Sequence, residues 1–598
     1  MNHKIDRDTY IIPPNFIESG TFFGGMFKAR NVIEAGILAF AIGVPVFSLL
    51  PLGLTARIIA LCLTALPAAL VALIGVSGES LSSFLLIFIK YLRNRRIVGG
   101  NSAEDAVPAA EHGGKHIKKK VHKPDKAPRR SRRSGREDFP AEFDEVRSYE
   151  IRQKLRPVKK QKPAKEKKAA RQKKKVSKER KVKRPIRTQE PKPACLNPVA
   201  DYLPISKIEN GIIYTKDHRY VKVVEVVPIN FMLRSAQEQR NIIYSFVSYL
   251  KISPIKLQIK VLTRRAEINR HLNTVRKEME QETNEQCLLM QEDYLQFVQQ
   301  IGSREAITRR FFLIFECEPW SNTKRSDEEG EAINALQSAV HTATNYLRQC
   351  GNEVIVPENW DEFTVDVLYN LLCRNESAVK PLSVRAQEVV AEYLAKGRDS
   401  EIDHIPATEF CAPKSIDFTH GHHICIDGLY YAYLLVPSDG YKTQVPAGWL
   451  SLIVNAGDGI DMDMFLSRQP KETIIQKVGQ QLRINRSKIK DASDTNTDFD
   501  DIDGAIRSGY FLKEGLANNE DFYYLNLLIT ITASNEEDLE WKVSEMKKLL
   551  LSQDMNACTC HFREEQAFLS ALPLVAMEKK LYERGKRNLL TGLSLIHI

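Results

Sequence analysis

The sequence predicts a membrane α-helical hairpin plus a soluble α+β region of two ferredoxin-like sandwich units, joined by a disordered basic linker. Three observations predict it: two apolar runs near the N-terminus, a stretch dominated by Lys and Arg, and an alternation of strand and helix patterns thereafter. The 598 residues exceed what one hydrophobic core holds. We predict these segments: an N-terminal cytoplasmic segment (1–31), the two-span hairpin with a following amphipathic helix (32–96), the linker (97–198), a first α+β unit (199–400), a second α+β unit (401–592) and a non-native tail (593–598).

The hairpin rests on two apolar runs, Val32–Leu54 and Ile58–Val76, each close to the ~20 residues that cross a bilayer core. The first contains one charged residue, Glu34, and the second contains none. Because the connection between them is only a tight turn, both outer ends must emerge on the same side of the membrane. A cleavable signal peptide fits poorly, since a second span follows the first.

Flanking charge predicts the orientation of the hairpin. Arg57 is the only basic residue in the turn, whereas Lys and Arg gather at the outer ends, at Lys28, Arg30, Lys90, Arg93, Arg95 and Arg96. Positive residues stay on the cytoplasmic side, so both termini should be cytoplasmic. Residues 82–96 have apolar side chains at helical spacing beside basic ones, which indicates an amphipathic helix at the inner membrane surface or an extension of the second span.

The linker holds most of the positive charge. Residues 115–192 contain 32 Lys and Arg against 10 Asp and Glu, which gives this stretch a net charge of +22. Since the net charge of the whole chain is +11, the other residues together carry −11. Few large apolar side chains occur between 101 and 197, so the stretch should be disordered. Three interpretations stay open: a tether with incidental attraction to anionic lipid, a direct contact with DNA, or neither.

The region from 201 onward alternates strands and helices. Its first part predicts strands at 219–227, 257–262 and 310–316, and helices at 235–250, 267–300 and 331–349. Its second part predicts strands at 429–436, 449–454, 522–532 and 558–562, and helices at 473–486, 502–516 and 536–551. The second part echoes the first, which favours two similar α+β units.

Several clusters suggest metal or redox chemistry but have the wrong spacing, so we assign no catalytic, cofactor-binding or metal-binding residue. The candidates for zinc are Cys411, His420, His422, His423 and Cys425, whose spacing fits a loop that leads into a strand better. Residues 494–498 open like a calcium loop, but Phe499 replaces the turn glycine and Ala505 the bidentate Glu. The ten cysteines lack a disulfide pattern, and Cys558 and Cys560 suit strand packing.

The N-terminal hundred residues carry a resemblance to a known family. Tyr10-Ile-Ile-Pro-Pro-Asn15, then Gly20-Thr-Phe-Phe-Gly-Gly25 and a two-span hairpin, resemble the PrgI-type membrane proteins of conjugative elements in Gram-positive bacteria. The resemblance implies a bacterial cell-membrane location and partners among the other subunits of a type IV secretion channel. Whether the chain forms homo-oligomers is left open.

A second resemblance covers about residues 200–592. Gln566-Ala-Phe-Leu-Ser-Ala-Leu-Pro-Leu574, followed by Arg584 and Asn588, is similar to the segment before the nucleotide-binding domain in TraC/TraE-type ATPases of conjugative transfer. The resemblance implies ATP and Mg only for a domain beyond this sequence. The phosphate-binding loop Gly-x-x-x-x-Gly-Lys-Ser/Thr is missing, and its nearest likeness, Gly440-Tyr-Lys-Thr443, has Tyr441 in place of the second glycine.

Two functional hypotheses follow. In the first, the chain is the membrane-anchored docking part of a conjugative ATPase, and in the second it is a complete non-enzymatic scaffold that recruits a separate ATPase. The tail Leu593-Ser-Leu-Ile-His-Ile598 is what one frame of a common sequencing adaptor would encode, so we expect a reading frame cut during sequencing; a natural stop is the alternative. An in-frame phosphate-binding loop downstream of codon 592 would exclude the scaffold.

Overall fold

The structure is a computed structural model that describes residues 9–11, 13, 21–22, 27–49, 53–76, 79–100, 195–265, 268–304, 307–317, 325–446, 448–491 and 497–591. The basic stretch 101–194 and the tail 592–598 lie outside the described residues. The predictions of disorder, lipid contact and DNA contact for the basic stretch therefore stay predictions.

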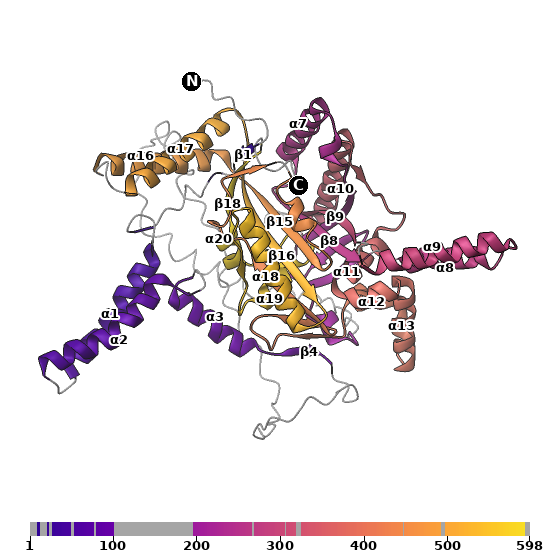
Figure 1. Cartoon of the computed structure of the whole chain (residues 1–598), viewed down its shortest axis with the longest axis horizontal. Helices are drawn as coiled ribbons and strands as arrows, with labels where there is room; N and C mark the ends of the chain where they lie inside the picture. The colour runs from indigo at the N-terminus through magenta and orange to yellow at the C-terminus, as the bar shows by residue number, and fades with distance from the viewer. Residues whose placement is uncertain are drawn as a thin grey trace, which may run out of the picture. The chain divides into compact units, whose positions relative to one another are not determined.

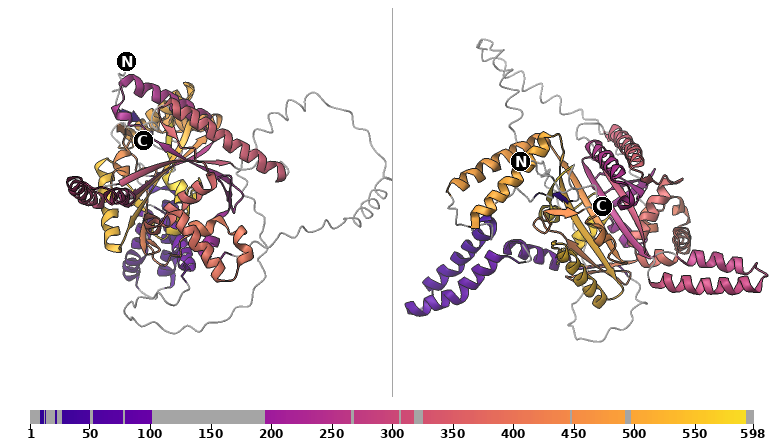
Figure 2. Two further views of the ribbon diagram at one scale, coloured as in Figure 1. Left: turned by 90° about the vertical axis from the view of Figure 1, so that its right-hand side faces the viewer. Right: turned by 45° about the horizontal axis from the view of Figure 1, so that its top comes forward.

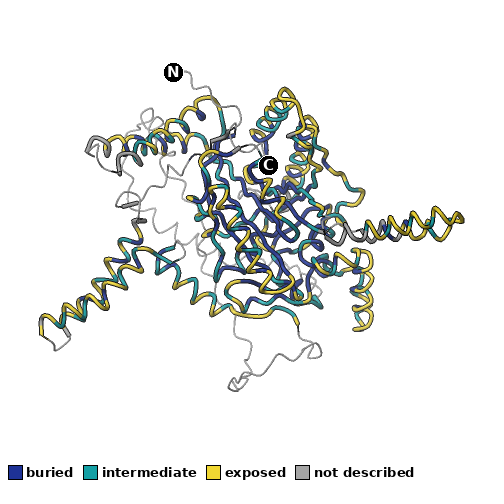
Figure 3. Tube along the Cα trace, viewed as in Figure 1, coloured by how far each residue is buried: buried dark blue, intermediate teal, exposed yellow. Residues whose placement is uncertain are grey.

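Two apolar helices, α1 (Ala29–Leu49) and α2 (Leu54–Ile74), pack against each other near the N-terminus (Figure 1). Within them, Arg30–Ser48 and Thr55–Ile74 are long and apolar enough to cross a membrane by length and composition. Only 11% of the apolar window in each helix is buried, and both helices are coloured mainly as exposed or intermediate (Figure 3). Helix α3 (Leu81–Asn94) follows, and its first turn is fixed to α1 because Glu34 accepts hydrogen bonds from the backbone N (3.0 Å) and the hydroxyl (2.6 Å) of Ser82.

The described part of the remaining chain is organised around one antiparallel sheet of 14 strands, in the order β4-β11-β12-β13-β16-β15-β8-β9-β7-β6-β5, with β10 beside β7, β17 beside β13 and β18 beside β16. The strands are β4 (Ile97–Gly99), β5 (Ile205–Glu209), β6 (Ile212–Thr215), β7 (Tyr220–Val227), β8 (Lys256–Arg265), β9 (Ile307–Cys317), β10 (Glu353–Val354), β11 (Ser415–Asp417), β12 (Ile424–Ile426), β13 (Leu429–Leu435), β15 (Ile460–Gln469), β16 (Phe522–Ala533), β17 (Cys558–Thr559) and β18 (Arg587–Leu590). Two short pairs complete the strands: β1 (Thr9–Ile11) with β14 (Gln444–Pro446), and β2 (Thr21–Phe22) with β3 (Phe27–Lys28).

The sheet consists of two halves with the same strand order. From the central pair outward, the first half runs β8-β9-β7-β6-β5 and the second runs β15-β16-β13-β12-β11. β14 lies outside this sheet and is not counted here. In each half, the fourth strand in chain order (β8 or β15) lies at the centre of the sheet, and the first (β5 or β11) lies farthest from the centre. The halves join where β8 pairs with β15, from Met462 opposite Val261 to Ser467 opposite Lys256.

Helical hairpins occupy equivalent places in the two halves. The α8 (Ile268–Met279) and α9 (Glu285–Arg304) helices connect β8 to β9, and α16 (Lys471–Asp491) and α17 (Thr497–Ala517) connect β15 to β16. Within each pair the helices lie side by side (Figure 1 and the right panel of Figure 2). A further helix follows each hairpin and its strand, α10 (Arg325–Gln349) in the first half and α18 (Glu536–Ser552) in the second.

Helices cover both faces of the sheet. One apolar core contains side chains of α7 (Ala236–Ile252), α10, α15 (Ser451–Val454) and α18, and the other contains side chains of α6 (Pro198–Tyr202), α11 (Trp360–Leu372), α14 (Ala407–Cys411), α19 (Glu564–Ala571) and α20 (Lys579–Gly585). The remaining helices are α12 (Arg374–Val379), α13 (Leu382–Ala395) and the 3-10 turns η1 (Phe231–Leu233) and η2 (Asp399–His404). Alternation along the central strands sends Leu257 and Val261 to the first core and Leu262 to the second.

Local sequence signals set several helix starts. Ser235 and Glu238 form a capping box at α7, in which each side chain bonds the other's backbone N–H. Asn359 and Asn535 cap α11 and α18 with their side-chain oxygens. These caps satisfy backbone donors that the first helical turn leaves without partners.

The structure corrects several predicted elements. Residues 449–454 were expected to be a strand, but Ser451–Val454 form helix α15. The single helix expected at 267–300 is two helices, α8 and α9. Within the predicted linker (97–198), Ile97–Gly99 form β4 of the sheet. The two predicted units contribute to one continuous antiparallel sheet with helices, and their ferredoxin-like type stays a prediction.

Candidate functional site

The centre of the sheet carries buried polar side chains that hold the segment after α19. Lys260 Nζ donates to the carbonyl of Ala571 (2.9 Å), and Gln258 Nε2 donates to the carbonyl of Leu572 (3.2 Å). The backbone N of Val575 donates to Gln258 Oε1 (2.8 Å). Residues 571–575 therefore lie against β8 at the centre of the sheet.

Lys260 also forms an ion pair with Asp463, which joins β8 to β15. The Lys260 Nζ lies 2.8 Å from Asp463 Oδ2, and both side chains are at most 2% exposed. Burial raises the pKa of Asp463 to about 6, while the Lys260 ammonium acts in the opposite direction. Removal of one partner would leave a charge buried without compensation, which is strongly destabilising.

Phe562 is the centre of the contact between α3 and the sheet region. The rings of Phe84, Phe88 and Tyr91 have centroids 5.9, 5.2 and 5.2 Å from that of Phe562. These three positions share one face of α3, since they are four and three residues apart. The pairs of Phe84 and Phe88 with Phe562 are edge-to-face, and such pairs contribute about 0.5–1.5 kcal/mol each beyond burial. We call the contact of Phe84, Phe88 and Tyr91 with Phe562 the α3 seat.

The loop that carries Phe562 is shaped for this contact. Phe562 has a φ of 60°, and its backbone N donates to the carbonyl of Gly421 (3.1 Å). A Cβ on Gly421 would lie 2.7 Å from Phe562 Cε1, so a larger residue there would displace the ring. Burial raises the pKa of the neighbouring Glu564 to about 9, which keeps its carboxyl group protonated at neutral pH.

Ion pairs and hydrogen bonds surround the aromatic contact. Arg563 Nη2 lies 2.5 Å from Glu79 Oε1, just before α3, and Tyr91 donates to the carbonyl of Thr419. Glu565 accepts hydrogen bonds from Arg96 (2.9 Å) and from the Tyr202 hydroxyl (2.9 Å). The α3 seat therefore combines apolar contact with charge pairing on both sides.

Two strand pairs extend the contact of the N-terminal segment with the second part of the chain, one inside the 14-stranded sheet and one outside it. β4 pairs with β11, with Val98 opposite Ile416, and β1 pairs with β14, with Tyr10 opposite Val445. Gly99 has a φ of 91°, and a Cβ there would lie 2.1 Å from the carbonyl oxygen of Lys414. The same Cβ would lie 2.9 Å from Val199, so the chain leaves for the basic stretch and returns from it at adjacent places.

The predicted zinc candidates are dispersed by the fold. His423 is buried and stacks on His420 at 4.5 Å, and His422 lies against His561, whereas Cys411 is buried in α14. Cys425 belongs to β12, so the loop does lead into a strand. Among the described residues, no group of His, Cys, Asp or Glu is arranged to hold a metal ion.

The other candidate segments have structural surroundings. Tyr441 is buried between β13 and β14, and the neighbouring Lys442 pairs with Asp554 at 2.8 Å. Of the calcium-like string, residues 494–496 lie outside the described residues, and α17 begins at Thr497. Cys558 lies in β17, and burial raises the pKa of Cys560 to about 12, which makes its thiol unreactive.

Sequence reasoning missed the α3 seat. The signal was present, because Phe84, Phe88 and Tyr91 recur at helical spacing on a face of α3 different from that of Leu85 and Ile89. A helix with two apolar faces can bury each of them against a different apolar surface. The partner, Phe562, is more than 450 residues away and no local pattern predicts it.

One comparison with known proteins identifies part of the chain. Residues 206–343 match the Archaeal TraC-like domain. The TraC-like match begins within β5, ends within α10 and so lies in the first half of the sheet. It supports a TraC-type, conjugation ATPase-like region and indicates a protein related to conjugation or type IV secretion. No curated protein matched the chain.

Proposed function

We propose that the chain is an inner-membrane-anchored component of a bacterial conjugative DNA-transfer machine, in which it is the docking N-terminal part of the transfer ATPase. The TraC-like match over 206–343 supports the link to conjugation. The α3 seat carries the docking part of the proposal, because it attaches the helix that follows two apolar helices to the loop after β17, a strand of the same sheet.

The membrane assignment has further support from α3 itself. Its exposed apolar side chains lie away from Phe562, and they are Leu85, Leu86, Ile89 and Leu92. A helix with one face on protein and an apolar face exposed beside two apolar helices suits the membrane surface. The resemblance of the N-terminal hundred residues to PrgI-type proteins, and the cytoplasmic location of both termini, remain part of the proposal.

DNA transfer in the bacterium that carries the gene tests this function. We expect deletion of the gene to abolish transfer, and Arg563→Glu to reduce transfer about tenfold or more, because it places two carboxylates against each other in the α3 seat. Combining Arg563→Glu with Glu79→Arg should restore much of the loss. Lys396→Glu, at an exposed ion pair with Glu392, is the matched control and should have little effect.

Two results would contradict the proposal. If the deletion strain transfers DNA at the normal frequency, the chain is not part of the transfer machine. If deletion abolishes transfer but Arg563→Glu and Lys396→Glu are equally harmless, the chain acts in transfer without needing the α3 seat.

A further inference from the structure

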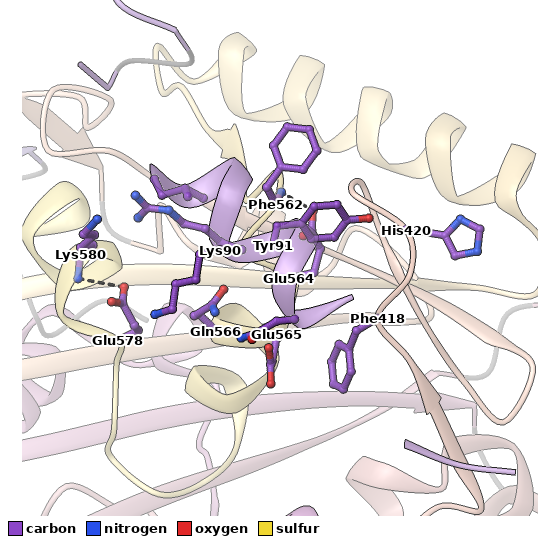
Figure 4. Close-up of a pocket in the computed structure, with 13 residues that line it drawn as sticks. Lys90, Tyr91, Phe418, His420, Phe562, Glu564, Glu565, Gln566, Glu578 and Lys580 are labelled. Atoms are coloured by element: carbon purple, nitrogen blue, oxygen red, sulfur yellow. Dashed lines mark hydrogen bonds between the residues drawn. The ribbon is translucent and has the colours of Figure 1, made fainter. Parts of the chain in front are cut away.

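A cavity of about 60 Å³ lies between α3 and the segments 562–566 and 578–580 (Figure 4). Lys90 reaches from α3 toward Gln566 and Glu578, and Lys580 lies on the far side of Glu578 (Figure 4). About 10–15 Å³ of such space suffices for one water. The cavity therefore has room for a group of phosphate size but not for a nucleotide.

Three Lys or Arg side chains and three acidic side chains line this cavity, and they differ in how many of their charges are paired. Lys90 and Lys580 line it, and neither ammonium forms an ion pair with a carboxylate in the described part of the chain. Arg563 also lines it and is only 6% exposed. Its Nη2 pairs with Glu79, but its buried Nη1 has no hydrogen-bond partner among the described residues. A buried guanidinium nitrogen without an acceptor indicates a missing anion or water.

The acidic residues of the cavity are already neutralised or engaged. Glu565 pairs with Arg96 and accepts the Tyr202 hydroxyl hydrogen bond. Glu578 accepts from the backbone N–H groups at the start of α20, at 2.9 and 3.1 Å. Glu564 is held protonated by burial. Glu578 keeps its negative charge, whereas the Glu565–Arg96 and Arg563–Glu79 pairs are neutral overall. The two ammonium groups of Lys90 and Lys580 therefore exceed the one unpaired carboxylate, and with Arg563 Nη1 they can bind an anion.

We propose that this cavity binds the phosphate group of a monoester or diester through Lys90, Lys580 and Arg563. Point charges from Lys and a guanidinium donor are the usual partners of phosphate oxygens. An anionic lipid headgroup and free phosphate share this chemistry, and both are arms of the test. The site rests on the α3 seat and is independent of any role in DNA transfer.

Binding to the purified full chain in neutral detergent tests the site. The probes are soluble dihexanoyl phosphatidylglycerol and inorganic phosphate. Microscale thermophoresis measures the Kd of each probe. We expect Lys90→Gln and Lys580→Gln to weaken binding about tenfold each, because each removes one charge that contacts the anion. Arg93→Gln on α3 and Lys579→Gln beside Lys580 remove the same charge outside the cavity and should change the Kd less than about twofold.

Each outcome decides the question. Equal weakening by all four substitutions would show only non-specific attraction, and the absence of saturable binding by both probes would also overturn the proposal. Tighter binding of the lipid supports a headgroup site, and equal binding of both probes supports a free phosphate. Lys580→Arg keeps the charge and should retain binding, and melting temperatures without probe separate lost binding from lost folding.

Discussion

The two halves of the sheet share a strand order but differ in what they attach. The first half, β5–β10, contains the TraC-like match, and among the described strands it pairs only with its own strands and with β15. The second half also contacts the N-terminal segment: β4 pairs with β11, and α3 packs on Phe562 after β17. The segment between β13 and β15 contributes β14, which pairs with β1 outside this sheet. The two halves therefore share a strand order, but the second half is the one that binds the N-terminal segment.

The equivalent helical hairpins differ in the same sense. The α16–α17 hairpin has its own apolar core, which reaches Phe522 of β16 and Leu590 of β18. The α8–α9 hairpin buries Leu272 and Val275 but leaves Met290 and Phe297 largely exposed. An equivalent place in the fold therefore does not imply equivalent packing.

Breaking the junction between the halves should have the largest effect. Lys260→Met leaves Asp463 buried without its partner, and we expect a loss of about 3–5 kcal/mol in the free energy of unfolding. Adding Asp463→Leu should recover part of this loss, because a neutral pair replaces a lone buried charge. Denaturant unfolding measures the stability of the single and the double variant. If Lys260→Met alone is as stable as the wild type, the pair does not join the halves.

Matched truncations should rank the hairpins. Leu512→Ala in α17 removes a fully buried side chain and should cost about 3 kcal/mol. Leu272→Ala in α8 should cost less, about 1–2 kcal/mol, because the surrounding hairpin is more exposed and can relax. Equal losses in denaturant unfolding would contradict the difference in packing between the hairpins.

Glu564→Gln should stabilise the second half at neutral and higher pH. The folded pKa of Glu564 is about 9, above its ordinary value of 4.5, so the folded chain binds the extra proton between these values. Stability therefore falls as pH rises from 4.5 to 9. Glutamine cannot ionise and can still accept the Phe562 hydrogen bond, so the gain near pH 7 should be about 2 kcal/mol. Thermal melts from pH 5 to 9 should show a flatter curve, and an unchanged slope would contradict the assignment.

Replacing residues 102–192 with a short Gly/Ser loop should have the smallest effect. The flanking residues Gly99 and Val199 are already in contact, so a short connection closes without strain. We expect a change below about 1 kcal/mol, since loop closure depends weakly on length. A variant that cannot fold would show that the basic stretch contributes to the stability of the sheet. A Gly/Ser replacement of the same length as residues 102–192 is the control, because it changes the composition of the stretch without changing its length.

Local periodicity predicted the elements with strong patterns, such as β16, α18 and the two apolar helices. It missed β15, the central strand of the second half, because Asp461 and Asp463 interrupt its apolar run. Those carboxylates are buried only because Thr263, Arg374 and Lys260 reach them from elsewhere in the chain. A buried polar side chain looks like a loop residue until its partner is known.

The candidate site was less predictable than the fold for the same reason. The run Gln566–Leu574 stood out by resemblance, but its contacts with Gln258 and Lys260 connect positions more than 300 residues apart. Phe562 showed no pattern of its own, and β4 is too short to be distinguished from the basic stretch that follows it. Local sequence specifies the helices and strands with strong apolar periodicity, whereas these long-range contacts decide which half of the sheet holds the N-terminal segment.

Cleavage of the full chain tests most directly whether the second half holds the N-terminal segment. A protease site placed between residues 102 and 192 would divide the purified, detergent-solubilised protein into an N-terminal piece and a C-terminal piece. We predict that the pieces stay together at high salt, because Phe562 contributes apolar contact that salt does not screen, and that Phe562→Ala with Arg563→Ala releases them. Release of the N-terminal piece from the unmodified protein on cleavage would contradict the account.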